Sequence, residues 1–220
     1  MIKLIIFDLD GTLADTILDI RDGLNGMLNE LGFPQVTEKQ TLSNINNGAL
    51  ELVRRSLPER FRDNEEFVKE AKAIYEKYYS ICYNNKTSEY NGVTTSLKAL
   101  RENGISLAVL SNKQHKFVQK IVKKLFGDIT FEYVNGQTEF IPTKPDPTAV
   151  IHIIESANVM KSEVLLVGDS NIDMMTAQNA GITPIGVSWG YRPKDLLIEC
   201  GAKLVLDTPI DIARLPNLLN

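Results

Sequence analysis

Short apolar runs recur along the chain, and each one stops abruptly at polar residues. Within a run the residues are continuously apolar, a pattern typical of strands that are buried on both faces of a parallel sheet. Segments with helical spacing lie between the runs. The runs are residues 3–7, 105–110, 164–167, 183–187 and 203–206, with a shorter candidate at 131–134. Alternating strands and helices predict a doubly wound, Rossmann-like α/β fold with a parallel sheet.

One connection in this pattern is much longer than a crossover requires. No strand pattern occurs between residues 15 and 91, whereas a crossover between parallel strands needs only about a dozen residues. Helical spacing, capping residues and an aromatic stripe predict three helices in this segment, over residues 17–31, 49–57 and 67–79. The sequence therefore predicts an α/β core of residues 1–14 and 88–220, interrupted by a helical cap of residues 15–87.

Composition narrows the classes of partner. The chain carries 24 basic and 28 acidic side chains, a net charge of -4 with both signs interspersed, so we expect no nucleic-acid surface. No run of about 18 uncharged apolar residues occurs, and we expect neither a membrane span nor a signal peptide. Two widely separated cysteines, Cys82 and Cys200, predict free thiols in a reducing compartment. These features predict a cytoplasmic protein. As a separate expectation, the protein is a monomer or a weak homodimer.

Polar residues cluster where the predicted strands end. In an open parallel sheet the carboxyl ends of the strands meet at one edge, where ligands bind. Each cluster alone has an ordinary explanation, since Asp and Gly form turns, Ser and Asn cap helices, and a lysine is usually solvated. Together they predict a site that combines acids, a hydroxyl, an amide and an ammonium group. The residues are Asp8-Leu9-Asp10-Gly11-Thr12, Ser111-Asn112, Lys144, and Gly168-Asp169-Ser170 with Asp173.

The side chains at this edge suit phosphoryl transfer. Asp8 and Asp169 offer hard oxygen ligands that fit Mg²⁺, and no His or Cys cluster favours a softer metal. A carboxylate and a phosphate repel by about 4 kcal/mol per charge pair at about 4 Å and an effective dielectric of about 20, and a cation cancels this repulsion. Asp8 is then able to attack phosphorus and form an aspartyl-phosphate. Asp10 is placed to protonate the leaving group and later to activate water.

The phosphate oxygens also need hydrogen-bond donors. Side chains at two strand ends and the main chain of the first loop supply them. The candidate donors are Lys144, Ser111, Asn112 and the main-chain N–H groups of Leu9, Gly11 and Thr12.

In this order, the clusters resemble the four motifs of the haloacid dehalogenase-like hydrolase superfamily. The match spans nearly the whole chain and is most specific at residues 8–12 and 168–173. The resemblance implies Asp8 as the nucleophile, Asp10 as the acid and base, and Ser111 and Lys144 as phosphate ligands.

The resemblance also implies a magnesium site. Its ligands would be Asp8, Asp169 and the main-chain carbonyl of Asp10, with Asp173 acting through water or by steadying Lys144. The helical insertion is similar to that superfamily's cap, which closes over the site and excludes water.

The second acid, Asp10, implies a branch of the superfamily. Dehalogenases lack it and need no Mg²⁺, so its presence indicates a phosphatase. Residues 90–93, 110–113 and 186–192 resemble phosphoglycolate phosphatases, although Asn91 and Gln114 stand where those proteins often have proline. The expected substrate is a small phosphorylated metabolite, phosphoglycolate. In the last of these segments, Trp189 is expected to anchor a packed loop.

Other functions remain open. A β-phosphoglucomutase-like mutase would form the same aspartyl-phosphate but return the phosphoryl group to a sugar phosphate. A pyrophosphatase or nucleotidase of the same superfamily would cleave a different phosphate bond. A receiver-like phospho-switch would carry its aspartate after the third strand and would lack the insertion, and neither property agrees with this sequence.

The cap is expected to select the substrate. Asn46, Asn47, Arg54 and Arg55 surround a turn at Gly48 and are candidate partners for a substrate carboxylate. A solvated helix face is the alternative interpretation of the same residues.

Overall fold

The computed structural model describes residues 1–218 and divides into two compact units. The core unit contains residues 1–14 and the chain from residue 89 on, and the cap unit contains residues 15–88. The chain passes between the units twice, through the two-residue strands β2 (Ala14–Asp15) and β3 (Ser88–Glu89). These two strands pair with each other.

The core unit contains a six-stranded sheet in which every neighbouring pair is parallel, in the order β5-β4-β1-β6-β7-β8. Every residue of β1 and β6 is buried, as expected for strands that are covered on both faces. The strands are β1 (Leu4–Phe7), β4 (Ser106–Gln114), β5 (Tyr133–Gln137), β6 (Val164–Gly168), β7 (Thr183–Val187) and β8 (Leu204–Leu206). The predicted Rossmann-like α/β fold is therefore confirmed.

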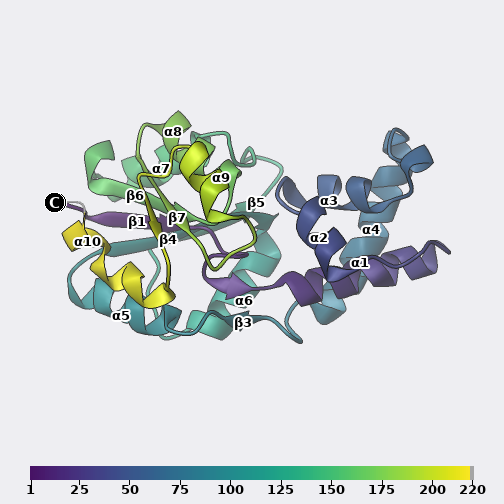
Figure 1. Cartoon of the computed structure of the whole chain (residues 1–220), viewed down its shortest axis with the longest axis horizontal. Helices are drawn as coiled ribbons and strands as arrows, with labels where there is room; N and C mark the ends of the chain where they lie inside the picture. The colour runs from purple at the N-terminus through teal and green to yellow at the C-terminus, as the bar shows by residue number, and fades with distance from the viewer. Residues whose placement is uncertain (219–220) are drawn as a thin grey trace. The chain divides into compact units, whose positions relative to one another are not determined.

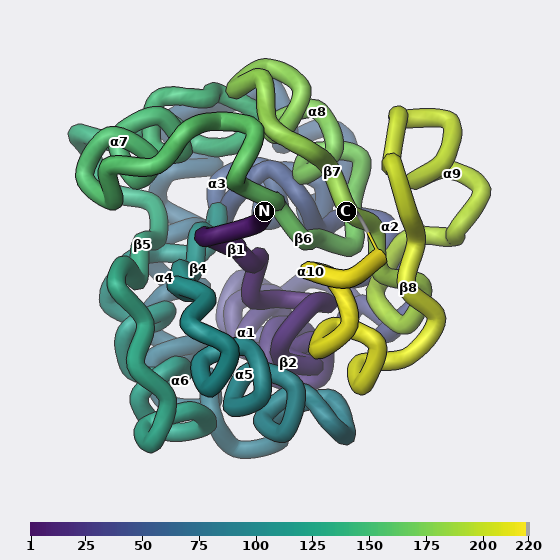
Figure 2. The backbone as a smooth tube through the Cα atoms, turned by 90° about the vertical axis from the view of Figure 1, so that its left-hand side faces the viewer, coloured from purple at the N-terminus to yellow at the C-terminus, as the bar shows by residue number. Residues whose placement is uncertain are grey.

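Helices cover both faces of this sheet (Figure 1). Figure 2, which looks roughly along the strands, shows α7 and α8 on one face and α5 and α6 on the other. Leu4 and Ile6 of β1 belong to one buried apolar cluster with Val150 and Ile153 of α7. The core helices are α5 (Val93–Glu102), α6 (His115–Phe126), α7 (Thr148–Ala157), α8 (Asn171–Ala180), α9 (Lys194–Glu199) and α10 (Leu215–Leu218), with 3₁₀ turns at Lys161–Glu163 and Pro209–Arg214.

The connections from β1 and β5 run to opposite sides of β1, and this switch in direction positions the polar loops. β4 lies on one side of β1 and β6 on the other, with Phe7 opposite both Val109 and Val167. In open α/β sheets such a reversal leaves a crevice at the carboxyl ends of the strands. The segments at the ends of β1, β4 and β6 therefore converge there.

The cap unit consists mainly of helices. Its helices are α1 (Ile17–Glu30), α2 (Glu38–Asn44), α3 (Gly48–Ser56) and α4 (Glu65–Cys82), with a 3₁₀ turn at Glu59–Phe61. α1 and α4 approach closely at a glycine, since a Cβ on Gly26 would lie 2.5 Å from the ring of Tyr78. In the aromatic stripe of α4, Tyr75 and Tyr79 are buried in the cap unit, whereas Phe67 and Tyr78 are half-buried. Within residues 1–218, no helix is both long and apolar enough to span a membrane.

Some elements differ from the sequence expectations. β4 runs past the predicted end at residue 110 because, after a shift in register, Gln114 pairs with Gln137 of β5. Ser111 and Asn112 therefore lie within a strand and not after it. The strand predicted at 131–134 is found at Tyr133–Gln137. Helix α2 was not predicted, and a capping box between Thr37 and Gln40 begins it.

Candidate active site

The loop after β1 is a tight turn that fixes two aspartates. The main-chain N–H of Asp8 donates to a carbonyl of β6 at 2.9 Å. The carbonyl of Leu9 accepts from the N–H groups of residues 12, 13 and 14, at 3.3, 3.0 and 2.9 Å. Gly11 has a φ of +83°, a left-handed conformation that glycine adopts without strain. The turn thus holds the main chain on both sides of Asp10.

Helix α8 begins directly after β6, and its N-terminal cap immobilises Asp173. The Ser170 Oγ accepts from the Asp173 N–H at 3.3 Å, while Asp173 Oδ2 accepts from the Ser170 N–H at 3.1 Å and from the Ser170 hydroxyl at 2.6 Å. This reciprocal pattern is a capping box. Gly168 leaves room for it, because a Cβ there would lie 2.3 Å from Asp173 Cγ. The other oxygen of Asp173 accepts from Lys144.

Lys144 connects the first and fourth motifs. Its Nζ lies 2.6 Å from Asp173 Oδ1 and 2.9 Å from Asp8 Oδ1, and its side chain is 4% exposed. Burial opposes the charge of Lys144, but attraction to Asp173 and Asp8 outweighs it and raises the pKa of Lys144 above its ordinary value. The lysine is therefore a charged group in contact with both aspartates.

Asn112 holds the main chain of Lys144. Its Nδ2 donates to the Lys144 carbonyl at 2.9 Å, and its Oδ1 accepts from the Lys144 N–H at 2.7 Å. Both ends of the amide thus contact one residue, so Asn112 positions Lys144. This contact was not predicted, because the sequence interpretation directed the same amide to the phosphate.

Three buried carboxylates face one another at the sheet edge. Asp8, Asp169 and Asp173 each offer an oxygen within 4.8 Å of the others. Burial is the main cause that raises the pKa of Asp8 to about 7; Lys144 opposes the shift, and Asp173 and Asp10 add to it. Burial, followed by Asp173 and Asp8, also raises the pKa of Asp169 well above its ordinary value. The negative charges of these carboxylates repel one another, and either proton uptake or cation binding relieves the repulsion.

The loop after β7 holds Asp169 from a third side. The Tyr191 N–H donates to Asp169 Oδ2 at 2.7 Å, and Trp189 Nε1 donates to the Thr12 carbonyl at 3.0 Å, in agreement with an anchoring role for Trp189. A Cβ on Gly190 would lie 2.2 Å from Asp169 Cβ. Sequence reasoning missed this approach of Gly190, because the contacting residues are far apart in the chain.

Lys113 forms an ion pair with Asp10. Its Nζ lies 2.8 and 2.9 Å from the two carboxylate oxygens, and the side chains of Lys113 and Asp10 are 7% and 14% exposed. The sequence interpretation gave Lys113 no role. The signal that could have found it is an ammonium group directly after Ser111-Asn112, at the same end of β4.

The profile of the haloacid dehalogenase-like hydrolase family matches residues 5–187. The chain belongs to this family. It is 35% identical over 195 residues to a protein of Vibrio vulnificus named phosphoglycolate phosphatase, covering 87% of this chain and 86% of that protein. A phosphoglycolate phosphatase of Psychrobacter arcticus is also 35% identical, over 198 residues that cover 86% and 85% of the two chains. A crystal structure from Haemophilus somnus, named "predicted phosphoglycolate phosphatase", has a TM-score of 0.89 and 29% identity, and covers 98% of both chains.

The donors of this haloacid dehalogenase-like hydrolase fit a hard divalent cation. Asp8 Oδ1 is buried, and apart from its 2.9 Å contact with the Lys144 ammonium it accepts no hydrogen bond among residues 1–218. Asp169 Oδ1 accepts one long bond, 3.4 Å, from the Thr12 hydroxyl. Buried carboxylate oxygens of this kind suit Mg²⁺ better than a metal that prefers nitrogen or sulfur. The site contains four aspartates but only two lysines, Lys113 and Lys144. A divalent cation would therefore balance the charge of these side chains. The aspartates are Asp8, Asp10, Asp169 and Asp173.

Several donors predicted for phosphate have partners inside the hydrolase fold. The Gly11 N–H donates to the Ala14 carbonyl at 2.9 Å, and the Thr12 N–H donates to the Leu9 carbonyl. Ser111 is buried at the sheet edge, and its Oγ accepts from the Lys113 N–H at 3.3 Å. The side chains at the edge that remain suited to a phosphate are the Ser111 hydroxyl and the Lys144 ammonium.

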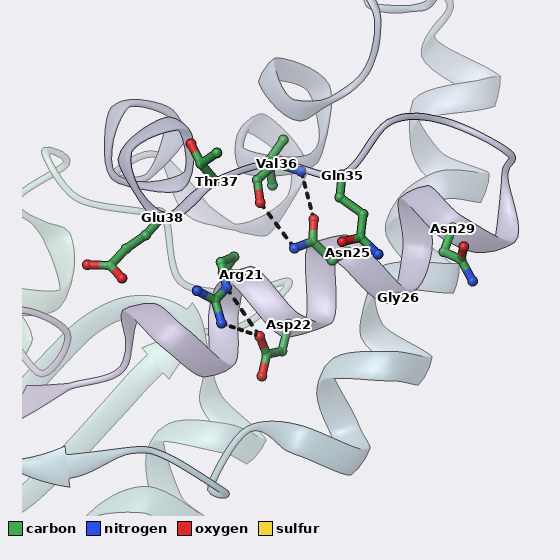
Figure 3. A pocket seen from close by; sticks show the side chains of 9 residues that line it. All are labelled: Arg21, Asp22, Asn25, Gly26, Asn29, Gln35, Val36, Thr37 and Glu38. Carbon is green, nitrogen blue, oxygen red and sulfur yellow. Dashed lines mark hydrogen bonds and ion pairs between the residues drawn. The ribbon is translucent and has the colours of Figure 1, made fainter.

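The cap unit of the hydrolase contains a separate cavity of about 670 Å³ (Figure 3). Two pairs of its lining residues bond to each other: the Asn25 amide donates to and accepts from the main chain of Val36, and Arg21 pairs with Asp22 at 2.9 Å. None of the predicted site residues lines it. The lining residues are Arg21, Asp22, Asn25, Gly26, Asn29, Gln35, Val36, Thr37 and Glu38.

The two cap arginines that the sequence analysis singled out differ in their surroundings. Arg54 contacts Glu51 and Glu65, both at 2.9 Å, and donates to the carbonyl of Arg62 at 2.6 Å. Its charge is thus balanced inside the cap, which argues against Arg54 as the carboxylate ligand. Arg55 makes longer contacts, 3.4 Å to the Asn44 carbonyl and 4.0 Å to Glu51.

Proposed function

We propose that this hydrolase is a Mg²⁺-dependent phosphatase that cleaves 2-phosphoglycolate through an aspartyl-phosphate on Asp8. The observation that carries the proposal is the position of Asp8, whose buried Oδ1 lies 2.9 Å from the Lys144 ammonium and accepts no other hydrogen bond in the described part of the chain. A nucleophile must keep an oxygen available for attack, and a nearby cation must hold the phosphate against it. Similarity to phosphoglycolate phosphatases over most of the chain supports the substrate.

In the first step, an oxygen of Asp8 attacks phosphorus and the ester P–O bond breaks. Asp10 donates its proton to the departing alkoxide, which leaves as glycolate. The product on the enzyme is an aspartyl-phosphate. Lys144 and the Ser111 hydroxyl hold phosphate oxygens, together with the main-chain N–H of Leu9.

In the second step, the carboxylate of Asp10 removes a proton from water. The water oxygen attacks phosphorus, the bond to Asp8 breaks, and inorganic phosphate leaves. Asp10 is thereby protonated again for the next substrate, and Asp8 returns as a carboxylate.

Asp8, Asp169 and the main-chain carbonyl of Asp10 would hold the magnesium ion in this proposal. Bound there, the ion supplies charge neutralisation between the nucleophile and the phosphate. Asp173 acts through Lys144, which it contacts at 2.6 Å, and is a positioning residue.

The test is a panel of phosphorylated metabolites assayed with and without Mg²⁺. We expect 2-phosphoglycolate to give the highest kcat/KM, and we expect phosphate release to stop in EDTA and in Asp8→Asn. Phosphate release that survives Asp8→Asn would exclude the mechanism. Isomerisation of a sugar phosphate with little phosphate release would indicate a mutase, and preferred cleavage of pyrophosphate or nucleotides would exclude the proposed substrate.

A further inference from the structure

Lys113 contacts Asp10, the residue that protonates the leaving group in the proposed reaction. Its Nζ is 2.8 and 2.9 Å from the two carboxylate oxygens of Asp10. In the proposed reaction, the ester oxygen that Asp10 protonates must come within about 2.7–3.0 Å of this carboxyl group. The Lys113 ammonium is therefore a neighbour of the leaving group as well as of Asp10.

The fold holds Lys113 firmly. It is the second-last residue of β4, and its N–H donates to Ser111 Oγ at 3.3 Å. The adjacent strand β5 packs directly on its main chain, since a Cβ on Gly136 would lie 2.5 Å from the Lys113 carbonyl oxygen. The side chain is 7% exposed. A buried charge on a rigid strand is a preorganised contact for a ligand.

The chemistry of this position favours an anion on the leaving group. An ammonium group carries a full positive charge and three N–H donors, so beside Asp10 it attracts a second carboxylate. In the phosphate ester of a 2-hydroxy acid, the carboxylate carbon is two bonds from the ester oxygen. A substrate whose ester oxygen contacts Asp10 therefore brings its carboxylate within reach of Lys113.

We infer that Lys113 binds the substrate carboxylate and gives the hydrolase its preference for phosphate esters of small 2-hydroxy acids over neutral phosphate esters. The inference rests on the proposed function and extends it to the residue that selects the substrate. It also assigns this selection to the core unit, whereas the sequence analysis expected it in the cap.

A binding comparison tests Lys113 without turnover. 3-Phosphonopropionate mimics phosphoglycolate but has no ester bond to cleave, and propylphosphonate carries a methyl group in place of its carboxylate. Both are titrated calorimetrically into the Mg²⁺-loaded protein. We expect wild type to bind 3-phosphonopropionate about tenfold or more tightly than propylphosphonate.

The same binding comparison on variants shows which residue causes the preference for the carboxylate. We expect Lys113→Met to bind the two phosphonates equally and Lys113→Arg to retain part of the preference for 3-phosphonopropionate. Lys194→Met, which changes an exposed lysine, should retain the full preference. Equal binding of the two phosphonates by wild type, or a preference that survives in Lys113→Met, would overturn the inference.

Kinetics separate substrate binding from a purely structural effect on Asp10. If Lys113 only orients Asp10, Lys113→Met lowers kcat/KM for 2-phosphoglycolate and ethyl phosphate by the same factor, which would also overturn the inference. The inferred contact instead predicts that the ratio of the two kcat/KM values falls about tenfold or more, mainly through KM. Preferential binding of 3-phosphonopropionate without phosphate release from 2-phosphoglycolate would reject the proposed function but support the Lys113 contact.

Discussion

Lys144 and Asp173 form an ion pair of 2.6 Å in which the side chains are 4% and 0% exposed. Removing one partner of a buried pair typically costs about 3–5 kcal/mol, because the other charge stays buried. We expect Asp173→Ala to lower the free energy of unfolding by about that amount and to reduce kcat at least tenfold. Urea unfolding and steady-state assays measure both effects.

An exposed ion pair supplies the control for this variant. Lys194 and Asp207 lie 2.7 Å apart, but their side chains are 43% and 66% exposed. Asp207→Ala should therefore change the free energy of unfolding by less than about 1 kcal/mol and leave kcat unchanged. Equal effects of the two variants would contradict the role given to Asp173.

Gly190 is predicted to be essential for the geometry of Asp169. A Cβ at this position would lie 2.2 Å from Asp169 Cβ and 2.4 Å from the Gly11 carbonyl oxygen. Gly190→Ala must displace one of them, so we expect the affinity for Mg²⁺ to fall at least tenfold, as for other residues that orient metal ligands. Calorimetric titration of Mg²⁺ measures this.

Gly104→Ala is the matched control for Gly190→Ala. Gly104 has a φ of +76°, and a Cβ at this position would have no atom of residues 1–218 within 4 Å apart from its chain neighbours. Alanine should therefore cost about 1–2 kcal/mol of stability through backbone strain alone. The Mg²⁺ affinity of Gly104→Ala should match that of wild type. An unaltered Mg²⁺ affinity in folded Gly190→Ala would refute the prediction.

The raised pKa of Asp8 predicts how stability depends on pH. Burial raises this pKa from 3.8 to about 7, so between these values the folded metal-free protein binds more protons at Asp8 than the unfolded chain does. The contribution of Asp8 to stability therefore falls as pH rises from about 4 to 7. Mg²⁺ competes with the same protons, so its stabilising effect should grow over this range.

Calorimetric Tm values at pH 5 and pH 8, with and without Mg²⁺, measure this linkage. We expect a larger Mg²⁺-induced rise in Tm at pH 8 than at pH 5. Asp8→Asn, which removes the titrating group, should reduce the difference. An equal rise at both pH values in wild type would argue against metal binding at Asp8.

Asp19 is predicted to stabilise the end of the cap. Its buried carboxylate accepts from the N–H of Lys86 at 3.0 Å, and from the N–H and hydroxyl of Thr87 at 2.8 and 2.7 Å. Asp19→Ala removes the acceptor of these donors, so we expect the free energy of unfolding to fall by about 2–3 kcal/mol. Hydrogen exchange over residues 83–88 should quicken at least tenfold. Asp22→Ala, which removes a more exposed carboxylate of α1, should have a smaller effect, and similar exchange in both variants would reject the role of Asp19.

The sheet and the convergence of the motifs could be predicted because both follow from local patterns. Apolar runs such as 164–167 are buried on both faces, so their composition alone identifies a central strand. The carboxyl ends of parallel strands share one edge, which is why Asp8 and Asp169 could be placed together from the sequence. The extension of β4 depends on the pairing of Gln114 with Gln137, a distant contact that no local pattern encodes.

The roles of individual polar groups were harder to predict. Asn112 is an ordinary amide in the sequence, and only its pairing with the main chain of Lys144 shows that it positions this lysine. In the sequence, Lys113 cannot be distinguished from a solvated lysine, and only the structure shows its ion pair with Asp10. In both cases the partner is more than 30 residues away in the chain, so the contact depends on the tertiary fold.

The most direct test is to trap the phosphorylated enzyme. Asp10→Asn should slow hydrolysis of the aspartyl-phosphate, so we would mix this variant with Mg²⁺ and p-nitrophenyl phosphate, whose leaving group needs little protonation, and quench it in acid. Borohydride reduction converts an aspartyl-phosphate to homoserine, which peptide mass spectrometry locates. The account predicts homoserine at position 8, and none when Asp8→Asn is added. Release of p-nitrophenol without homoserine at position 8, or homoserine at another aspartate, would contradict it.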